Sequence, residues 1–411
     1  MKNTVLNFPA TRREFISSSA KGAGLLAFSQ FVPGFLRDSI AAGAPTPETD
    51  RRILVLVQLA GGNDGLNTVI PYEDSNYYRL RPTLGIKKKE AIPLTDDHGL
   101  HPSCEAISQL YKEGKLSIVQ NVGYPNPNRS HFRSTEIWEG ATDANEFGDS
   151  GWVGRYLDNN CSGTPDIGEP EAITFGNELP LTVQGETSHN LFSINNRPGN
   201  INRADYGLLD KMVSPAENPD NASFLKQTMM DTLITEERIQ KLFTKFSAKT
   251  PYPNNRLAAS LKNVASLISS DLPTRVYFVS LGGFDTHQGQ VQNHQRLLRE
   301  LSTSLGAFQN DLTARGLEDK VLTMTFSEFG RRPSQNESGG TDHGTAAPLF
   351  VMGTQIKDTI IGTPPNLDLK HNKDLEFSTD FRSVYSTVLE KWLECDSEAV
   401  LGGKFTNLSF I

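Results

Sequence analysis

Short apolar runs alternate with amphipathic segments along most of the chain after residue 50. The first run, 53–59, is almost continuous and rich in β-branched residues, as is typical of a strand buried on both faces of a parallel sheet. Four further apolar segments, each with part of its neighbouring loop, read as strands: 115–125, 274–287, 319–332 and 347–353. The clearest helix, with apolar residues three and four apart, covers 294–316. The alternation predicts an α/β fold with a doubly wound, mostly parallel sheet flanked by helices.

Two further segments complete this picture. The span 158–253 is rich in Asn, Pro, Gly and Ser before it becomes helical within 221–246. We interpret it as an insertion that caps one edge of the sheet and partly covers the site. The span 377–394 predicts a closing helix with four inward side chains, Phe381, Val384, Val388 and Trp392. Residues 45–411 are therefore expected to form a single α/β domain.

The first 44 residues have a different character. Arg12 and Arg13 precede a weakly apolar, Gly/Ala-rich stretch at 22–35, and small residues at 41–45 suit cleavage. This stretch is shorter than the ~20 apolar residues that a membrane span needs. The pattern predicts a twin-arginine signal peptide over 1–44, recognised by the twin-arginine export machinery, and a mature protein in the periplasm or outside the cell. A solvated basic turn before an ordinary helix is the alternative.

Composition narrows the classes of partner. The formal net charge is −8, no block of Lys and Arg suggests nucleic acid, and no second apolar run suggests a stable membrane span in the mature protein. The three cysteines, Cys104, Cys161 and Cys395, are too few and odd in number for a disulfide scaffold. One bridge remains open, and the sequence does not choose its partners.

Polar residues gather at the ends of the predicted strands. They are Asp64, Ser130, Asp285, His287, Glu328, Asp342 and His343. Open parallel sheets bind ligands at the carboxyl ends of their strands, so we expect these side chains to lie together. Several carboxylates at one place raise one another's pKa, and a bound divalent cation is the usual remedy. Mixed oxygen and nitrogen ligation fits zinc or manganese, whereas oxygen ligation alone fits calcium or magnesium.

Each of these acidic and histidine residues also has a structural alternative. Asp64 and Asp342 can be turn residues, and Asp285 can cap a strand end. Glu328 can pair with Arg331 or Arg332. The two histidines can be hydrogen-bonded polar residues at a loop edge. Their joint placement at strand ends is what favours the metal site.

Ser130 lies where the helix after the second strand should begin. Its position predicts an N-cap, and the same geometry lets a helix N-terminus stabilise an anion. Beside a metal ion, its hydroxyl can act as an alkoxide nucleophile. Arg129 and His131 flank it and can bind or protonate an oxyanion.

Several motifs together resemble a known family. They are the twin-arginine start, LVQLAGGNDGLN, NRSHF, GWVGRYLD, GGFDTHQGQ, FSEFGRR and GGTDHGTAAPLFVMG. This set resembles an exported bacterial family of unknown function within the alkaline-phosphatase and sulfatase-like superfamily. The resemblance implies an alkaline-phosphatase-like fold and a metal-dependent esterase core. In that core Asp64, Asp285, His287 and His343 correspond to metal-site positions, and Ser130 corresponds to the nucleophile.

The chain departs from the superfamily at three places. Glu328-Phe329 replaces the usual Asp-His pair, and Asp285 and His287 are closer together than usual. A Cys-x-Pro-x-Arg stretch, which carries the formylglycine nucleophile of most sulfatases, is absent from the sequence. We therefore expect a secreted hydrolase of phosphate or sulfate esters that uses a divalent metal and a serine nucleophile. The alternative is a metal-stabilised binding or assembly protein with reduced catalysis on the same fold.

The export signal gives a direct prediction. The double substitution Arg12→Lys and Arg13→Lys should leave the precursor in the cytoplasm, because the export receptor reads the guanidinium pair. Cell fractionation with immunoblotting measures the distribution. Normal periplasmic accumulation of the double variant would remove the twin-arginine interpretation.

Overall fold

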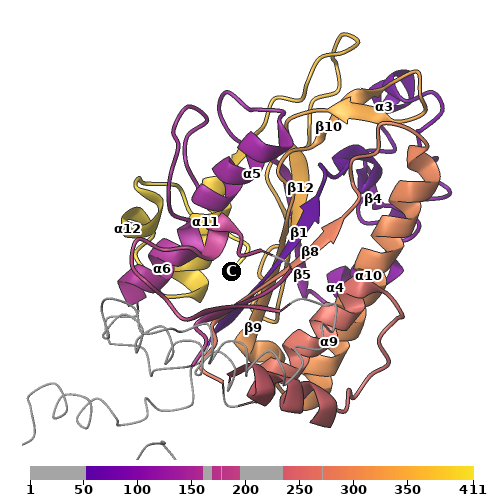
Figure 1. Ribbon diagram of the computed structural model, residues 1–411. Helices are drawn as coiled ribbons and strands as arrows, with labels where there is room; N and C mark the ends of the chain where they lie inside the picture. The colour runs from indigo at the N-terminus through magenta and orange to yellow at the C-terminus, as the bar shows by residue number, and fades with distance from the viewer. Residues whose placement is uncertain (1–51, 161–168, 177, 195–234, 271) are drawn as a thin grey trace, which may run out of the picture. The chain divides into compact units, whose positions relative to one another are not determined.

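The computed structural model describes residues 52–160, 169–176, 178–194, 235–270 and 272–411 (Figure 1). The predicted signal peptide and much of the predicted cap lie outside these residues, so both remain predictions. Within the described residues, no helix combines the length and the apolar composition needed to cross a membrane.

A nine-stranded sheet forms the centre of the described structure, in the order β13-β5-β12-β9-β1-β8-β6-β7, with β14 also paired to β5. Its strands are β1 (Ile53–Ala60), β5 (Leu116–Gly123), β6 (Ala172–Phe175), β7 (Leu191–Ile194), β8 (Val276–Gly282), β9 (Val321–Phe326), β12 (Ala347–Met352), β13 (Ile360–Ile361) and β14 (Thr379–Asp380). Two smaller sheets accompany it: the hairpin β10 (Arg331–Gln335) with β11 (Thr341–His343), and β2 (Val69–Ile70) with β4 (Gly99–Leu100) and β3 (Ile92–Pro93).

Strand direction decides which loops meet. β1 runs parallel to β8 on one side and to β9 on the other, whereas β12 is antiparallel to both β5 and β9. β5 therefore runs in the same direction as β1. The carboxyl ends of β1, β5, β8 and β9 and the amino end of β12 consequently lie at one edge of the sheet. The predicted mostly parallel α/β fold is confirmed, with β12 as its antiparallel strand.

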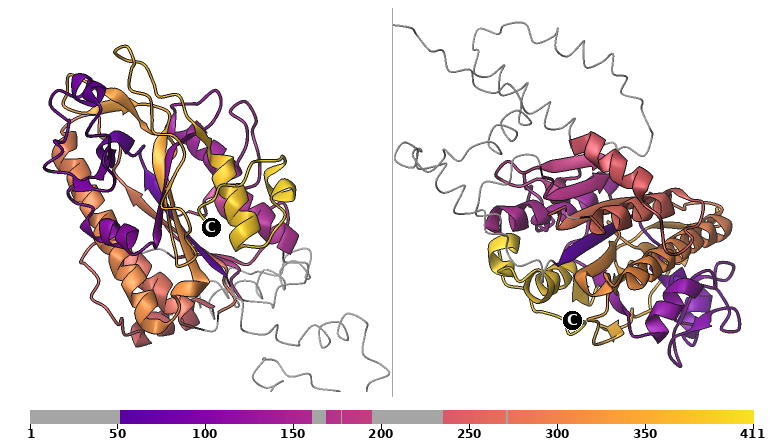
Figure 2. Two further views of the ribbon diagram at one scale, coloured as in Figure 1. Left: turned by 180° about the vertical axis from the view of Figure 1, so that it is seen from behind. Right: turned by 90° about the horizontal axis from the view of Figure 1, so that it is seen from below.

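Helices cover both faces of the sheet. They are α3 (Ser75–Leu80), α4 (Glu105–Lys112), α5 (His131–Gly140), α6 (Trp152–Asn160), α9 (Arg256–Ile268), α10 (Gln290–Arg315), α11 (Phe381–Thr387) and α12 (Ser397–Leu401). Figure 1 and Figure 2 show α4, α9 and α10 on one side of the sheet and α5, α6, α11 and α12 on the other. Each face of the sheet has its own hydrophobic core, and successive side chains of β1 pack into the two cores in turn. Val55 and Val57 lie in one core, and Leu54 and Leu56 lie in the other. This two-sided burial explains why the strand reads as a continuous apolar run.

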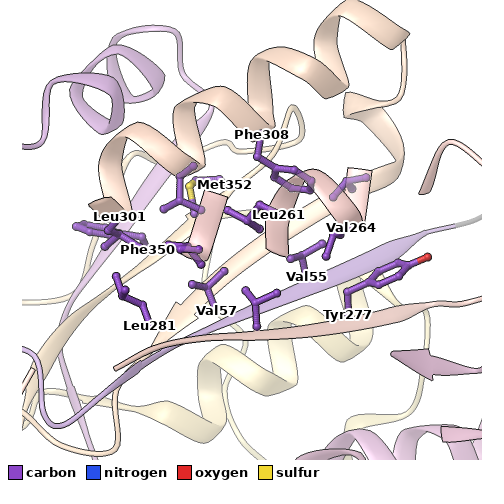
Figure 3. Close-up of a cluster of buried hydrophobic side chains, with 14 of the residues drawn as sticks. Val55, Val57, Leu261, Val264, Tyr277, Leu281, Leu301, Phe308, Phe350 and Met352 are labelled. Atoms are coloured by element: carbon purple, nitrogen blue, oxygen red, sulfur yellow. The ribbon is translucent and has the colours of Figure 1, made fainter. Parts of the chain in front are cut away.

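The core under α9 and α10 shows how these helices are fixed. Leu261 and Val264 of α9 and Leu301 and Phe308 of α10 point toward the sheet (Figure 3). Each of these side chains is at most 1% exposed. Full burial of such a side chain stabilises the fold by roughly 1.5–3 kcal/mol. The start of α10, which borders the site described below, is thereby held against the sheet.

Some elements differ from the sequence expectations. β6 and β7 fall within 158–253 and extend the sheet, and the sequence analysis missed both because each has only four residues. The closing helix is shorter than predicted, because α11 passes into a π-helical turn, η5 (Val388–Trp392). Its four predicted inward side chains are all buried. Cys104 and Cys395 are free and buried, and Cys161 lies outside the described residues.

A buried carboxyl group on α5 predicts a pH dependence of stability. Burial raises the pKa of Glu139 from 4.5 to about 7, although the backbone N–H groups of Leu181 and Thr182 favour its charged form. The folded state thus holds a proton that the unfolded state releases. The contribution is complete below pH 4.5 and is lost as pH rises to about 7. Its slope is about 1.4 kcal/mol per pH unit.

We expect Glu139→Gln to remove this part of the pH dependence. Denaturant unfolding of wild type and variant across the same pH range measures it. Glu337→Gln, at an exposed glutamate between β10 and β11, is the control and should keep the wild-type profile. Parallel profiles for wild type and Glu139→Gln would contradict the assignment.

Candidate metal centre

The edge formed by these strand ends gathers most of the predicted site residues. The loop after β8 supplies Asp285 and His287, and the first residue of α5 is His131. Glu328 follows β9, and His343 ends β11, shortly before β12. His343 can reach this edge because β12 enters the sheet in the opposite direction to its neighbours.

Asp285 is the centre of a cluster with three imidazoles. Nε2 of His287 and Nε2 of His343 each lie 3.1 Å from Asp285 Oδ1. Nε2 of His131 lies 3.5 Å from Asp285 Oδ2. The two nitrogens of His287 and His343 are 2.9 Å apart. Ligand atoms of His131, Asp285 and His343 all fall within 4.8 Å of one another.

The other ring nitrogen of each histidine is held by an acceptor. His131 Nδ1 lies 2.9 Å from Glu328 Oε1, His287 Nδ1 lies 3.2 Å from Asp342 Oδ1, and His343 Nδ1 lies 2.8 Å from the Arg129 carbonyl. A carboxylate or a carbonyl oxygen can only accept, so each Nδ1 carries the hydrogen. In a neutral ring, Nε2 then presents its lone pair to Asp285. Histidine ligands of metal ions are commonly oriented in this way, by an acceptor bonded to the ring nitrogen that does not face the ion.

The cluster fits a divalent cation of the zinc type. Two imidazole lone pairs that face one carboxylate oxygen repel unless a proton or a cation lies among them. Burial lowers the pKa of His343, which disfavours a second proton on that ring. Donor atoms around a tetrahedral zinc ion are about 3.3 Å apart, given zinc–nitrogen bonds of about 2.0–2.1 Å. The separations of 2.9–3.5 Å seen here bracket that value. Nitrogen-rich donors favour zinc or a similar transition metal over calcium or magnesium.

Asp285 is also fixed by a buried guanidinium group. Arg331 is 1% exposed and donates from Nη2 to Asp285 Oδ1 at 2.6 Å. Burial of Asp285 opposes its charge, but the hydrogen bond and the positive charge of Arg331 prevail and lower its pKa to about 2. Asp285 is therefore ionised at any physiological pH. From the sequence alone, Arg331 was expected as a possible partner of Glu328.

Glu328 and Phe329 support the cluster from the end of β9. Glu328 is 2% exposed, and its Oε1 accepts from the Gly61 N–H at 2.8 Å as well as from His131. Its other oxygen, Oε2, has no hydrogen-bond partner among the described residues. The Phe329 ring packs against the rings of His131 and His343, with centroids 4.9 and 4.7 Å away. Phe329 thus positions two histidines, a role that sequence spacing could not reveal.

Glycines make this close packing possible. A Cβ atom at Gly62 would lie 2.3 Å from the Phe329 ring. A Cβ atom at Gly340 would lie 2.4 Å from the His287 carbonyl. The GGTDH loop can therefore lie directly against the loop that carries Asp285 and His287. Asp342, held by Asn336 and His287, has a lowered pKa and is a second-sphere partner of His287 in this geometry.

The structure does not bring Asp64 into the histidine cluster. Asp64 is fully buried, and its Oδ2 accepts from Arg81 Nη1 at 2.6 Å and from the amide of Gln290. Burial opposes its charge, but the guanidinium of Arg81 prevails and lowers its pKa. Asp64 Oδ1 has no partner among the described residues. A metal-binding role for Asp64 stays a prediction.

Ser130 occupies the N-cap position of α5, as predicted, but its hydroxyl makes no capping hydrogen bond. Its backbone carbonyl accepts from the Ser134 N–H at 2.9 Å, and its own N–H donates to Asn128 Oδ1 at 2.8 Å. The residue is exposed, and the preceding carbonyl of Arg129 is the group bonded to His343. The exposed Arg129 side chain bonds to Asp374 at 3.2 Å. Ser130 is thus adjacent in sequence to two residues that contribute to the cluster, Arg129 through its carbonyl and His131 through its ring.

Comparison with known proteins adds the following. Residues 267–401 match the model of a family described as proteins of unknown function (DUF1501). This segment contains Asp285, His287, Glu328, Asp342 and His343. A search of curated proteins gave no match.

Similar solved structures include three whose descriptions are informative. The zinc complex of the C-terminal periplasmic domain of EcEptC from Escherichia coli is 9% identical, with 74% of this chain and 73% of that chain covered and a TM-score of 0.35. Lipoteichoic acid synthase LtaP from Listeria monocytogenes is 9% identical, with 87% and 74% covered and a TM-score of 0.35. A protein in the alkaline phosphatase superfamily from Vibrio parahaemolyticus is 10% identical, with 76% and 62% covered and a TM-score of 0.32. No residue role is transferred from them, and the site rests on its own geometry.

The cluster predicts stoichiometric metal binding. We expect one zinc-like ion per chain, and we expect His343→Ala to lose most of it together with the thermal stabilisation that the ion provides. Elemental analysis and thermal unfolding with and without a chelator measure both effects. His371→Ala, an exposed histidine away from the cluster, is the control and should bind as wild type does. Equal metal content in His343→Ala and wild type would refute the cluster as the binding site.

Proposed function

We propose that the protein is a metal-dependent hydrolase of phosphate or sulfate esters, with His131, His287, His343 and Asp285 as ligands of one divalent cation and Ser130 as nucleophile. The observation that carries this proposal is that three imidazoles, each held at Nδ1 by an acceptor, converge on Asp285. Ser130, whose hydroxyl makes no capping hydrogen bond, directly precedes one of them in the sequence. When bound, the cation would supply Lewis acidity toward an ester oxygen and toward a nearby hydroxyl.

The protein's own groups are suited to an anionic substrate. Ser130 is the N-cap residue of α5, so the free N–H groups of the first helical turn point toward a group bound there. Arg129 and His131 flank the serine, and the side chain of Arg129 is exposed. Attack by Ser130 Oγ would form a bond to phosphorus or sulfur as the bond to the alcohol breaks. Water would then hydrolyse the serine ester.

The cluster is open enough for a substrate to reach it. The side chains of His287 and Asp285 are 43% and 46% exposed, and that of His343 is 24% exposed. The backs of these groups are buried against Arg331 and Phe329. A site that is rigid behind and open in front favours binding of a large or surface-bound ester. The proposal places this activity in the periplasm or outside the cell, after export by the twin-arginine machinery.

Ser130→Ala separates catalysis from structure. Since the hydroxyl makes no capping hydrogen bond, the substitution should change the free energy of unfolding by less than the ~1 kcal/mol typical of a lost cap. It should leave metal content intact and reduce turnover by a factor of at least about a hundred. Steady-state assays on a panel of phosphate and sulfate esters, with elemental analysis of the same samples, measure all three. Ser247→Ala, another exposed serine, is the matched control.

Two outcomes would change the proposal. Full activity in Ser130→Ala would remove the serine as nucleophile. A metal-loaded wild type that hydrolyses no ester of the panel would favour a metal-stabilised binding or assembly protein on the same fold.

A further inference from the structure

A second polar site lies behind the metal cluster, at the start of α10. A cleft of about 430 Å³ opens between the first turns of α10 and the segment 84–102. Its lining residues are Asn67, Leu84, Ile86, Glu90, His101, Pro102, Gln290, Val291, His294 and Gln295. Its volume falls within the roughly 300–1,000 Å³ that is usual for small-molecule sites.

Two nearly buried imidazoles line this cleft. His101 is 7% exposed and His294 is 2% exposed, and their ring centroids are 6.0 Å apart in an edge-to-face arrangement. His101 Nδ1 accepts from the Ser103 N–H at 3.0 Å, so the hydrogen of the neutral ring is on Nε2. His294 Nε2 lies 3.0 Å from Asn63 Oδ1 and donates to it, so its lone pair is on Nδ1. Within the described residues, the hydrogen bonds of these two rings are made by His101 Nδ1 and His294 Nε2, which leaves His101 Nε2 and His294 Nδ1 for a ligand or for water.

The rings are uncharged at physiological pH. Burial lowers the pKa of His101 and of His294 to about 4, and the carboxylate of Asp64 opposes this shift without reversing it. Among the lining residues only Glu90 carries a formal charge, and it is negative. The cleft therefore lacks a cation to hold an anionic ligand. The hydrogen on His101 Nε2 also disfavours a metal ion shared by the two rings.

The remaining chemistry suits an uncharged hydroxyl compound. A hydroxyl group can accept from His101 Nε2 and donate to His294 Nδ1 at the same time. Leu84, Ile86 and Pro102 offer apolar contacts to the C–H groups that accompany hydroxyls in a sugar or polyol. In the part of the chain that the structure describes, no protein group pairs with either nitrogen, so a ligand that bonds to both forms two hydrogen bonds that the protein alone does not make.

We propose that this cleft is a binding site for the uncharged hydroxylated face of a sugar, bound between His101 and His294. The site is separate from the metal cluster but connected to it through Gln290. The Gln290 amide lines the cleft, donates to Asp64, and accepts from Thr341 Oγ1 at 2.7 Å and from Thr286 Oγ1 at 3.1 Å. These threonines adjoin Asp342 and Asp285 in the sequence. The proposal does not depend on hydrolase activity.

Histidine-selective ¹⁵N NMR tests it on the full mature chain. The ring nitrogens of His101 and His294, assigned through His101→Gln and His294→Gln, should shift on titration with glucose, whereas inorganic phosphate and zinc should leave them in place. A parallel titration with maltohexaose distinguishes two sources of the sugar. Tighter binding of maltohexaose indicates a glycan chain, and tighter binding of glucose indicates a free sugar. The resonances of His371, which is exposed elsewhere, provide the internal control.

A blocking variant guards against effects of lost histidines on folding. Val291 is 55% exposed and lines the cleft, so Val291→Trp should fill it without touching the imidazole hydrogen bonds. Binding should weaken at least about tenfold, equivalent to about 1.4 kcal/mol. The proposal is overturned if neither glucose nor maltohexaose shifts the two rings, which would leave water as their partner. It is equally overturned if phosphate or zinc produces the shifts, or if Val291→Trp binds as wild type does.

Discussion

The buried guanidinium of Arg331 is the constraint on which the site depends. It donates to the carbonyls of Gly62, Thr341 and Phe284 at 2.8–3.0 Å, to the Gly61 carbonyl, and to Asp285. These acceptors belong to the loops after β1 and β8 and to β11, which are far apart in sequence. One side chain thus satisfies backbone carbonyls that the ends of the strands leave unpaired, and it sets the position of Asp285. Removal of such a group would leave several buried acceptors without donors, each costly by ~1–3 kcal/mol.

Strand direction then determines what surrounds Asp285. β8 and β9 flank β1 and run parallel to it, so Asp285 and Glu328 emerge at the same edge, on either side of β1. β12 returns in the opposite direction, so the hairpin that precedes it places His343 at the same edge. His131 comes from α5, which starts above the end of β5. The three histidines therefore reach one carboxylate from three separate segments, and each is locked at Nδ1 by a different acceptor.

The sequence was sufficient to predict the fold and the edge of the sheet at which the site lies, but not how the side chains of the site are arranged. Continuous apolar strands such as 53–59, together with helices between them, were sufficient to predict the sheet, because burial on both faces leaves a clear pattern. The short strands β6 and β7 left no such pattern. Asp285, His287 and His343 could be selected because each follows or precedes a predicted strand. Two other features could not be predicted: the packing of Phe329 against the histidines and the buried pairing of Asp64 with Arg81. Both depend on contacts between segments that are distant in sequence.

The physical reason for expecting a metal also changes once the contacts are known. The sequence argument was that several carboxylates at one edge would repel and need a cation. In the structure Asp64 and Asp285 already have permanent cations beside them, Arg81 and Arg331, and both carboxylates have lowered pKa values. Charge balance therefore does not require two metal ions. The reason to expect a cation is instead that imidazole lone pairs converge on Asp285. Arg81 and Arg331 do not satisfy these lone pairs, because their N–H groups are directed at Asp64, at Asp285 and at backbone carbonyls rather than at the imidazole nitrogens. A single nitrogen-rich site is the arrangement that this geometry favours.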